Sequence, residues 1–336
     1  MSLKERRILK LYSNDVVRWE HDGKQYCLHI RTDEFPENPR EWHNVAIMAC
    51  WHGRYNLGDE IAEKEPEDFW RRLVKENVPE SEVYASAEAG RLHGIEICKN
   101  GDDAELIDIY STYLHDAKDG VGLRKDLEYD KLRKEDVVEC LIDIIEVKNC
   151  MTLLGPYAEW LPLWLYDHGG ITISCGSRTG QYADRWDSGA AGWIVMLKKT
   201  IMDEVGTEYV LDDAGEMIWV EHKHPDAPST WSYLTKPLTD ETWRKRAIEI
   251  MEAEVEIYDQ YLTGDAYGFN LYSAELVEEE KEPEWNEEES CWGFLGSDMM
   301  ENGIVDEVGN GFREMVETGN YEQGRAVEHS CFRFLF

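Results

Sequence analysis

The sequence predicts an α+β fold, with a mixed or antiparallel sheet core and several amphipathic helices. Residues 161–197 hold short, β-branched apolar runs separated by Gly and Asp, which is typical of buried strands joined by turns. Residues 135–148 and 241–262 instead place apolar side chains at helical spacing. The length of 336 residues favours one compact domain over 1–336, with room for two subdomains that meet near Asn149.

The first third of the chain carries signals for a hairpin and a helix. Asp22-Gly23 stands between two apolar runs, and this dipeptide favours the tight turn of a β-hairpin. Pro66 fits the first turn of a helix, where no amide donor is needed, and Pro79 follows the expected end. Further elements are expected at residues 45–51 as a strand, 81–89 as a helix, and 106–114 as a strand or a helix.

Three apolar runs form the middle of the chain. They cover residues 161–166, 171–175 and 192–197, and the Gly and Asp residues between them indicate turns. We expect them to pair as adjacent buried strands near the centre of a sheet. A second hairpin is expected around residues 212–215, between strands at 209–211 and 216–221.

The longest helix is expected at residues 241–262. Thr239 or Asp240 would cap its start, and Gly264 would end it. Its predicted buried stripe consists of Trp243, Ala247, Met251, Val255, Tyr258 and Leu262. A strand is expected after it, at residues 267–272.

The formal net charge is −35. Such a surface repels nucleic acids and anionic membranes and attracts basic partners. Duplex DNA carries one charge per ~1.7 Å of axis, so ~35 charges match ~60 Å of duplex. That length is close to the ~50 Å diameter expected for a compact chain of this size. The charge therefore predicts a basic protein as partner, with no direct binding of nucleic acid or membrane.

Eight cysteines occur, and none forms a C-x-x-C pair. Most stand inside apolar runs, where a free Cys behaves as a small hydrophobic residue. We expect all eight to be free thiols, as is usual in a reducing compartment. They are Cys27, Cys50, Cys98, Cys140, Cys150, Cys175, Cys291 and Cys331.

An acidic segment covers residues 275–289, with nine Glu and one Lys. Blocks of like charge repel one another and are usually solvated. The nine carboxylates are the predicted partner-binding residues: Glu275, Glu278, Glu279, Glu280, Glu282, Glu284, Glu287, Glu288 and Glu289.

A second candidate is a polar site formed by residues of two loops. One group lies in and after the DHGG turn: Asp167, His168, Asp187 and Ser188. The other lies in the loop after the strand at 45–51: His52, Arg54 and Asp59. The structural alternatives are hydrogen bonds within the turns and an internal salt-bridge network, and the sequence favours both of these.

Three residue pairs suggest other chemistry. Cys175 and His168 could form a nucleophile pair, Asp167 and Asp187 an acid–base pair. His222 and His224 could bind a metal, but no third ligand stands nearby. No phosphate-binding, dinucleotide-binding or zinc-finger motif is present, so we expect no cofactor and no metal, and assign no catalytic residue.

Five strings carry a resemblance to a family of acidic proteins encoded by bacteriophages and bacterial mobile elements. They are REWHNVAIMACWHGRYNLGDE, LPLWLYDHGGITIS, RWDSGAAGWI, YDQYLTGDAYGF and SCWGFLGSDMMENG, and they run from Arg40 to Gly303. The family often has a Cys two residues before the Trp of WDSG, where this chain has Asp184. A cysteine nucleophile at that position is therefore not expected here.

The resemblance implies an accessory protein in the cytoplasm of a bacterial host cell. Acidic accessory proteins of this kind often block host defence by mimicking DNA. We therefore expect inhibition of a basic DNA-binding host or defence protein, in the manner of anti-restriction or anti-CRISPR proteins. Two alternatives remain open: an enzyme that uses the Asp167 and His168 turn, and a structural or assembly protein.

Overall fold

The computed structural model describes residues 12–99, 106–115, 123–128, 132–183, 186–224, 227–276, 283–327 and 330–335. Within these ranges the chain combines α-helices with antiparallel sheets, which confirms the predicted α+β class. No described helix is both long enough and apolar enough to cross a lipid bilayer.

The strands are β1 (Asp15–His21), β2 (Lys24–Thr32), β3 (Ile47–Cys50), β4 (Ile95–Lys99), β5 (Leu106–His115), β6 (Leu123–Glu128), β7 (Leu132–Arg133), β8 (Ala158–Asp167), β9 (Ile171–Cys175), β10 (Ser188–Leu197), β11 (Thr207–Tyr209), β12 (Trp219–His224), β13 (Ala227–Tyr233), β14 (Thr235–Pro237), β15 (Ala266–Glu275), β16 (Asn286–Leu295), β17 (Glu322–Val327) and β18 (Ser330–Leu335). The helices are α1 (Pro66–Asn77), α2 (Glu80–Glu88), α3 (Lys134–Ile144), α4 (Val147–Leu154), α5 (Lys198–Thr200), α6 (Trp243–Thr263), α7 (Ile304–Val308) and α8 (Phe312–Thr318).

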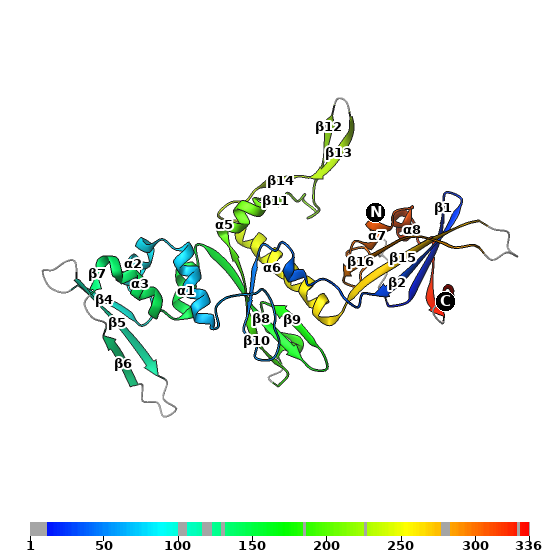
Figure 1. Ribbon diagram of the computed structural model, residues 1–336. Helices are drawn as coiled ribbons and strands as arrows, with labels where there is room; N and C mark the ends of the chain where they lie inside the picture. The colour runs from blue at the N-terminus through cyan, green and yellow to red at the C-terminus, as the bar shows by residue number, and fades with distance from the viewer. Residues whose placement is uncertain are drawn as a thin grey trace.

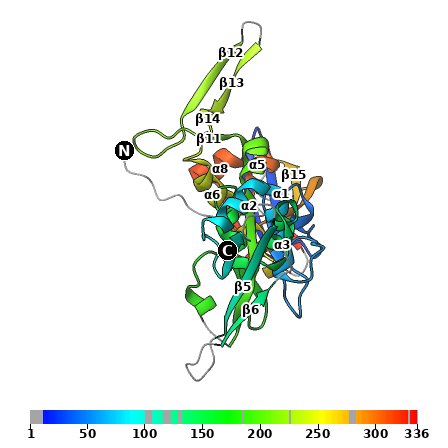
Figure 2. The ribbon, with the colours of Figure 1, turned by 90° about the vertical axis from the view of Figure 1, so that its left-hand side faces the viewer.

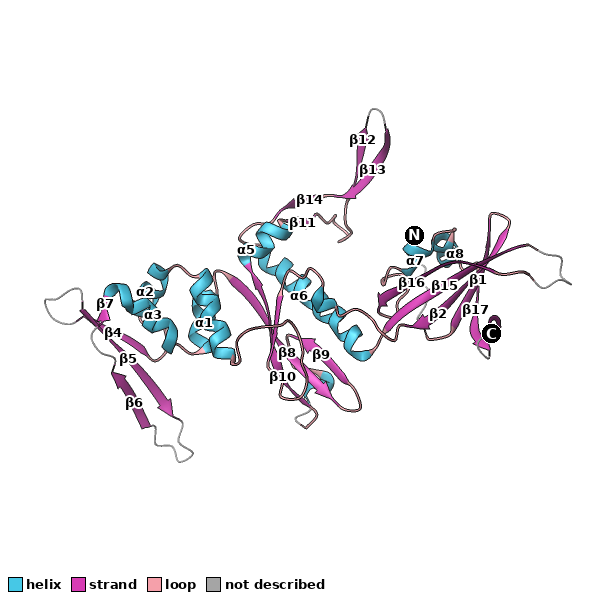
Figure 3. Cartoon of the chain, viewed as in Figure 1, coloured by secondary structure: helices cyan, strands magenta, loops and turns pink. Residues whose placement is uncertain are grey.

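Three units lie in a row along the molecule, and a fourth group of strands projects from them (Figure 1). The helical unit contains α1–α4 and β4–β7, and the central sheet has the order β3-β10-β8-β9 with α6. The terminal sheet has the order β16-β15-β2-β1-β17-β18 and is covered by α7 and α8. The arm consists of β11–β14. Figure 3 shows α1, α2 and α3 in the helical unit and one long helix, α6, along the central sheet.

The central sheet confirms the prediction for residues 161–197. β8 lies between β10 and β9, and both pairings are antiparallel. β10 is buried on both faces, because Ile194 packs with α6 whereas Val195 packs with the helical unit. Alternate residues of a strand point to opposite faces, so a strand covered on both sides reads as a continuous apolar run. Gly192 lets β3 approach, since a Cβ there would lie 2.0 Å from the carbonyl oxygen of Ala49.

Helix α6 covers the face of the central sheet opposite to the helical unit. The predicted stripe is buried from Trp243 to Tyr258, and Gly264 ends the helix in the left-handed conformation, with φ of 74°. The first turn before it is closed by Thr239, whose hydroxyl accepts hydrogen bonds from the amides of Glu241 and Thr242. The helix itself begins at Trp243 after Thr242, which makes no side-chain cap hydrogen bond, so the expected cap at Thr239 or Asp240 is wrong.

The terminal sheet begins with the expected hairpin. Asp22 and Gly23 join β1 to β2 with φ of 47° and 78°, the left-handed values that a two-residue hairpin turn requires. One face of the sheet packs against α7 and α8, where Trp19 stacks on Tyr26 and contacts Phe312. This packing fixes β15 and β16 in a sheet with its own apolar core.

The helical unit joins the central sheet through an aromatic cluster. Trp70 of α1 is fully buried and meets Trp160 of β8 and Trp193 of β10 edge to face, at ring-centroid distances of 5.5 and 5.7 Å. The expected helix at residues 135–148 is instead two helices, α3 and α4. On a continuous helix Ile145 and Cys150 would lie about 140° apart. The break lets both enter the same core.

Asn149 belongs to this core. It is buried in α4, and its side-chain amide binds the backbone of His93 through two hydrogen bonds, of 2.8 and 2.9 Å. The buried apolar residues form three main clusters, one for each unit. A single domain with two subdomains meeting near Asn149 therefore stays a prediction.

The hairpin expected between residues 209–211 and 216–221 is present only as a short pairing around the turn. Leu211 forms an antiparallel bridge with Met217, and the amide of Ile218 donates to the carbonyl of Val210. The longer strands pair elsewhere, β11 with β14 and β12 with β13. The side chain of Asp212 closes the local turn by accepting hydrogen bonds from the amides of Ala214 and Glu216. The turn is thus present, but the flanking strands find longer partners in residues 227–237.

Among the described thiols, six are free: Cys27, Cys50, Cys140, Cys150, Cys175 and Cys291. Burial raises the pKa of Cys50 and of Cys150 to about 12, and that of Cys175 to about 11. Because these pKa values lie far above pH 8, the three thiols should remain almost wholly protonated at that pH. They should therefore react slowly, since the thiolate is the reactive form.

We expect thiol titration of the denatured, unreduced protein to count eight groups. In the native protein at pH 8, Cys50, Cys150 and Cys175 should react far more slowly than after denaturation. Mass mapping of the labelled cysteines measures both results. A count below eight that reductant restores would show a disulfide.

Candidate functional site

The described part of the acidic segment lies at the outer edge of the terminal sheet. β16 is the last strand of that sheet within the described residues, and its first half carries Glu287, Glu288 and Glu289, all exposed. Glu275, at the end of β15, and Glu284, before β16, are also exposed. The solvated character of the whole segment stays a prediction. Glu278, Glu279, Glu280 and Glu282 lie outside the described residues.

Four of the nine carboxylates of this segment, Glu275, Glu287, Glu288 and Glu289, lie on strands. Between Leu271 and Tyr272 the register of β15 with β16 shifts, which places an extra residue, Glu288, in a bulge. Glu288 accepts a hydrogen bond from the hydroxyl of Ser273, and Glu287 accepts one of 2.9 Å from Asn270. Asn270 and Ser273 differ by an odd number of positions, so these two carboxylates reach opposite faces of the sheet.

More carboxylates belong to the same unit. Residues 271–336 contain seventeen Asp and Glu against four Lys and Arg. The outer sides of α7 and α8 contribute exposed Asp306, Glu307, Glu314 and Glu317, of which Arg313 pairs with Asp306 and Glu317. The negative charge of the terminal sheet therefore comes from several elements and exceeds the local supply of basic residues.

The second candidate site forms where β8 ends. Nη1 of Arg54 lies 2.7 Å from Oδ2 of Asp167, and the hydroxyl of Tyr55 donates to the same oxygen at 3.0 Å. The ring of His52 stacks on Tyr55, with centroids 5.3 Å apart. The loop after β3 and the end of β8 thus meet through one carboxylate that has two partners.

His168 and Asp187 form the other half of this polar group. Nδ1 of His168 lies 3.1 Å from Oδ2 of Asp187, and the backbone amide of Asp167 donates to the carbonyl of Asp187. Ser188 receives a hydrogen bond from Arg178 and donates to the carbonyl of Tyr182. The imidazole is 70% exposed. These contacts are ion pairs and turn hydrogen bonds, the structural alternative that the sequence favoured.

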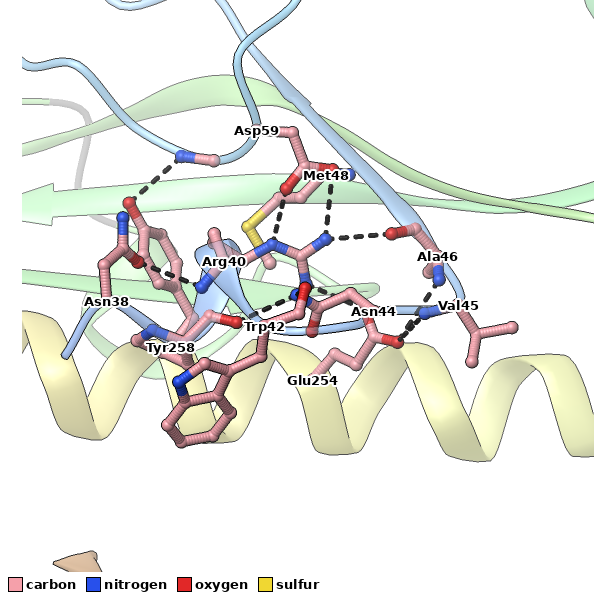
Figure 4. A network of polar contacts seen from close by, with 12 residues as sticks. Asn38, Arg40, Trp42, Asn44, Val45, Ala46, Met48, Asp59, Glu254 and Tyr258 are labelled. Atoms are coloured by element: carbon pink, nitrogen blue, oxygen red, sulfur yellow. Dashed lines mark hydrogen bonds and ion pairs between the residues drawn. The ribbon is translucent and has the colours of Figure 1, made fainter. Parts of the chain in front are cut away.

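Asp59 does not join the polar group. It faces Arg40, whose guanidinium is almost fully buried and binds both oxygens of Asp59, at 2.7 and 3.0 Å (Figure 4). Nη1 of Arg40 reaches Glu254 of α6 at 2.7 Å, and Nη2 donates to the carbonyl of Ala46. Burial acts to lower the pKa of Arg40, but the two carboxylates outweigh it and raise that pKa.

The two carboxylates around Arg40 also accept backbone hydrogen bonds. Glu254 accepts from the amides of Val45 and Ala46, and Asp59 accepts from the amide of Met48. Figure 4 shows these groups converging between α6 and the segment from Asn38 to Met48. The cluster therefore links the start of β3 to α6. Its guanidinium and two carboxylates bind one another and nearby backbone groups.

The proposed pair of Cys175 and His168 is wrong. Cys175 is opposite Leu163 in the β8–β9 register, whereas His168 is at the turn, next to the pair of Asp167 and Ile171. Four strand positions separate Cys175 from the turn, or about 13 Å at strand rise. Such a separation is too long for proton transfer between a thiol and an imidazole.

His222, considered above as a metal ligand, contacts a serine hydroxyl. Its Nε2 lies 2.6 Å from the hydroxyl of Ser232 on the neighbouring strand, and a register shift follows it. The side chain of His224 lies outside the described residues, so the pair is not placed. The described part of the chain holds no group of three or more possible metal ligands.

Sequence reasoning missed the partners that lie far along the chain. Arg40 and Glu254 are 214 positions apart, and Tyr55 and Asp167 are 112 apart. Asp259 of α6 similarly binds Thr172 and the amide of Ile173 on β9. No local pattern in one sequence points to such pairs.

Comparisons of this chain with protein-family models, curated proteins and solved structures found no match. The resemblance to acidic phage and mobile-element proteins therefore stays a prediction.

Proposed function

We propose that this protein binds a basic surface of a DNA-binding protein and thereby competes with DNA. The observation that supports it most is the acidic edge of the terminal sheet: Glu287, Glu288 and Glu289 are exposed on an ordered strand. Carboxylates held by a packed sheet lose less conformational freedom on binding than carboxylates on a flexible tail. The partner is a host or defence protein if the phage-like strings indicate the origin of the chain.

The overall charge supports the same proposal. A net charge of −35 raises the rate at which basic partners are encountered and repels nucleic acids. Exposed carboxylates at the rim of an interface act mainly on the association rate, and their effect falls as salt rises. The proposal therefore predicts fast, salt-sensitive association with a basic protein.

The test uses a six-residue variant and a matched control. In the first, Glu278, Glu279, Glu280, Glu287, Glu288 and Glu289 are replaced by Gln. In the control, six exposed carboxylates outside residues 275–289 are replaced by Gln: Glu60, Glu67, Glu80, Glu241, Glu252 and Glu256. Both variants lose the same number of charges, so they separate the position of the acids from the total charge.

We expect a bacterial protein captured by the parent to associate about tenfold more slowly with the first variant, because steering by charge contributes one to three orders of magnitude. The association rate of the control variant should fall much less. Surface plasmon resonance with the captured protein, at several salt concentrations, measures both rates. Equal association rates for the parent and the first variant would refute the proposal.

The same assay tests the use of Asp167 and His168 as an active site. Asp167→Asn and His168→Ala leave the acidic segment intact, so they should leave binding and inhibition of the partner unchanged. If inhibition is lost in His168→Ala but kept in the six-residue variant, the polar group at the end of β8 is the functional site.

A further inference from the structure

The arm carries an unusual share of the exposed apolar surface. Thirteen large hydrophobic side chains are exposed in the described residues, and six of them lie between residues 209 and 234. They are Tyr209, Leu211, Met217, Trp219, Trp231 and Leu234. Contiguous exposed apolar surface on a protein indicates an interaction site. Figures 1 and 2, seen from directions at right angles, both show the β12–β13 ribbon extending away from the three units.

One face of the ribbon is aromatic. Trp219 is paired with Tyr233 across the two strands, and Glu221 is paired with Trp231. Residues two apart on a strand share a face, so these four side chains lie on the same side. The rings of Trp219 and Tyr233 are 4.0 Å apart, and Tyr209 meets Tyr233 edge to face at 5.5 Å. Trp219 and Trp231 are nevertheless 54% and 59% exposed.

The base of the arm is attached to the central sheet. The guanidinium of Arg246, on α6, lies over the ring of Tyr209 at 5.5 Å, and the amide of Leu238 donates to the carbonyl of Gly206. Lys236 pairs with Glu208 across β11 and β14 at 3.2 Å. The aromatic face is thus presented on a short, supported ribbon.

Several acidic groups lie near the aromatic face. Glu221 shares the face, and Asp212, Asp213 and Glu216 are exposed at the turn next to Leu211. Tryptophan and tyrosine rings attract cations over their faces, most strongly Arg, and nearby carboxylates add to this attraction. Cations on alternate residues of an extended peptide repeat every ~6.6 Å, the spacing of same-face residues in β12 and β13.

We propose that the arm docks an extended basic segment of a partner protein, whose Arg or Lys side chains stack on Trp219, Trp231 and Tyr233. A second copy of this chain fits less well, because it would bring another acidic arm and a further net charge of −35. The surface is separate from the acidic edge at β16. The docking therefore holds even if the function proposed for that edge is wrong.

The test uses a fluorescent ten-residue peptide of alternating Arg and Thr, with a Glu–Thr peptide of the same length as the negative probe. We expect the double variant Trp219→Ala, Trp231→Ala to weaken binding of the Arg–Thr peptide about tenfold, from two cation–π contacts. The double variant with Phe at both positions should keep much of the affinity, since it keeps both aromatic faces. The matched control is Trp186→Ala, which removes a 94% exposed Trp outside the arm and should change affinity less than about twofold.

Four other outcomes would each reject docking of a basic segment on the arm. Equal affinity of the parent and the double Ala variant, or equal binding of the Glu–Thr peptide, would overturn the proposal. Sedimentation that shows a parent dimer and a monomeric double Ala variant would assign the face to a second copy, and would also overturn it. If the Gln variant of residues 278–280 and 287–289 alone loses the peptide, the peptide binds the acidic edge. That result would reject the arm while supporting the function proposed for the edge.

Discussion

Replacing Arg40 by Met should lower the free energy of unfolding by about 3–5 kcal/mol, the usual cost of breaking a buried ion pair from one side. The guanidinium is almost fully buried and holds Asp59 and Glu254, which are themselves largely covered. Removing it leaves two carboxylates with no cation between α6 and the start of β3. Urea unfolding of both proteins measures the difference.

Two further variants show whether the unpaired charges cause that loss. Arg313→Met removes a half-exposed arginine that also pairs with two carboxylates, and should cost less than about 1 kcal/mol. Adding Asp59→Asn and Glu254→Gln to Arg40→Met should restore part of the lost stability, because no charge then remains buried. Equal stability of Arg40→Met and Arg313→Met would contradict this explanation.

Replacing Trp70 by Ala should also be severe, with an expected loss of about 3–5 kcal/mol. Its ring is fully buried and joins α1 to β8 and β10 through Trp160 and Trp193. The cavity would open at the boundary between the helical unit and the central sheet. Hydrogen exchange should therefore speed up in α1–α4 and change little in the terminal sheet.

Trp70→Phe is the matched test of the packing argument. Among the described residues the indole nitrogen of Trp70 has no hydrogen-bond partner, so Phe loses no such bond and keeps an edge-to-face ring. We expect Trp70→Phe to cost clearly less than Trp70→Ala, and Trp186→Ala, at an exposed position, to cost almost nothing. A loss in Trp70→Phe as large as in Trp70→Ala would show that the ring contacts are not what stabilises the boundary.

Local patterns in the sequence predicted the elements whose cause is local. Asp22-Gly23 predicted a hairpin because both residues tolerate positive φ, and Pro66 and Pro79 predicted where α1 begins and ends. The runs at 161–197 predicted adjacent strands because β10 is buried on both sides.

The pairings that depend on distant residues were not predictable in the same way. Residues 207–209 pair with 235–237, so Tyr209 joins β14 although the side chain of Asp212 closes the turn that follows. Asp59 was grouped with His52 and Arg54 by nearness in sequence, yet its partner is Arg40 across the start of β3. Asp167 meets Arg54 and Tyr55 at the end of β8, and these contacts join residues more than 100 positions apart in the sequence.

The aromatic arm illustrates the same limit for function. Trp231 stands between polar residues and Trp219 stands between Ile218 and Val220, and both patterns are compatible with a buried or half-buried strand. Only the register, which aligns Trp219 with Tyr233 on a ribbon without a covering layer in the described residues, identifies an exposed aromatic face.

A competition assay with DNA tests directly whether this protein and DNA bind the same basic surface of the partner. The protein captured by the parent chain is bound to a labelled DNA duplex, and the chain is titrated in while fluorescence anisotropy reports bound DNA. We expect complete displacement of the DNA, and we expect the Gln variant of residues 278–280 and 287–289 to require about tenfold more protein for the same displacement. A stable complex that contains the partner, the DNA and this chain together would contradict it.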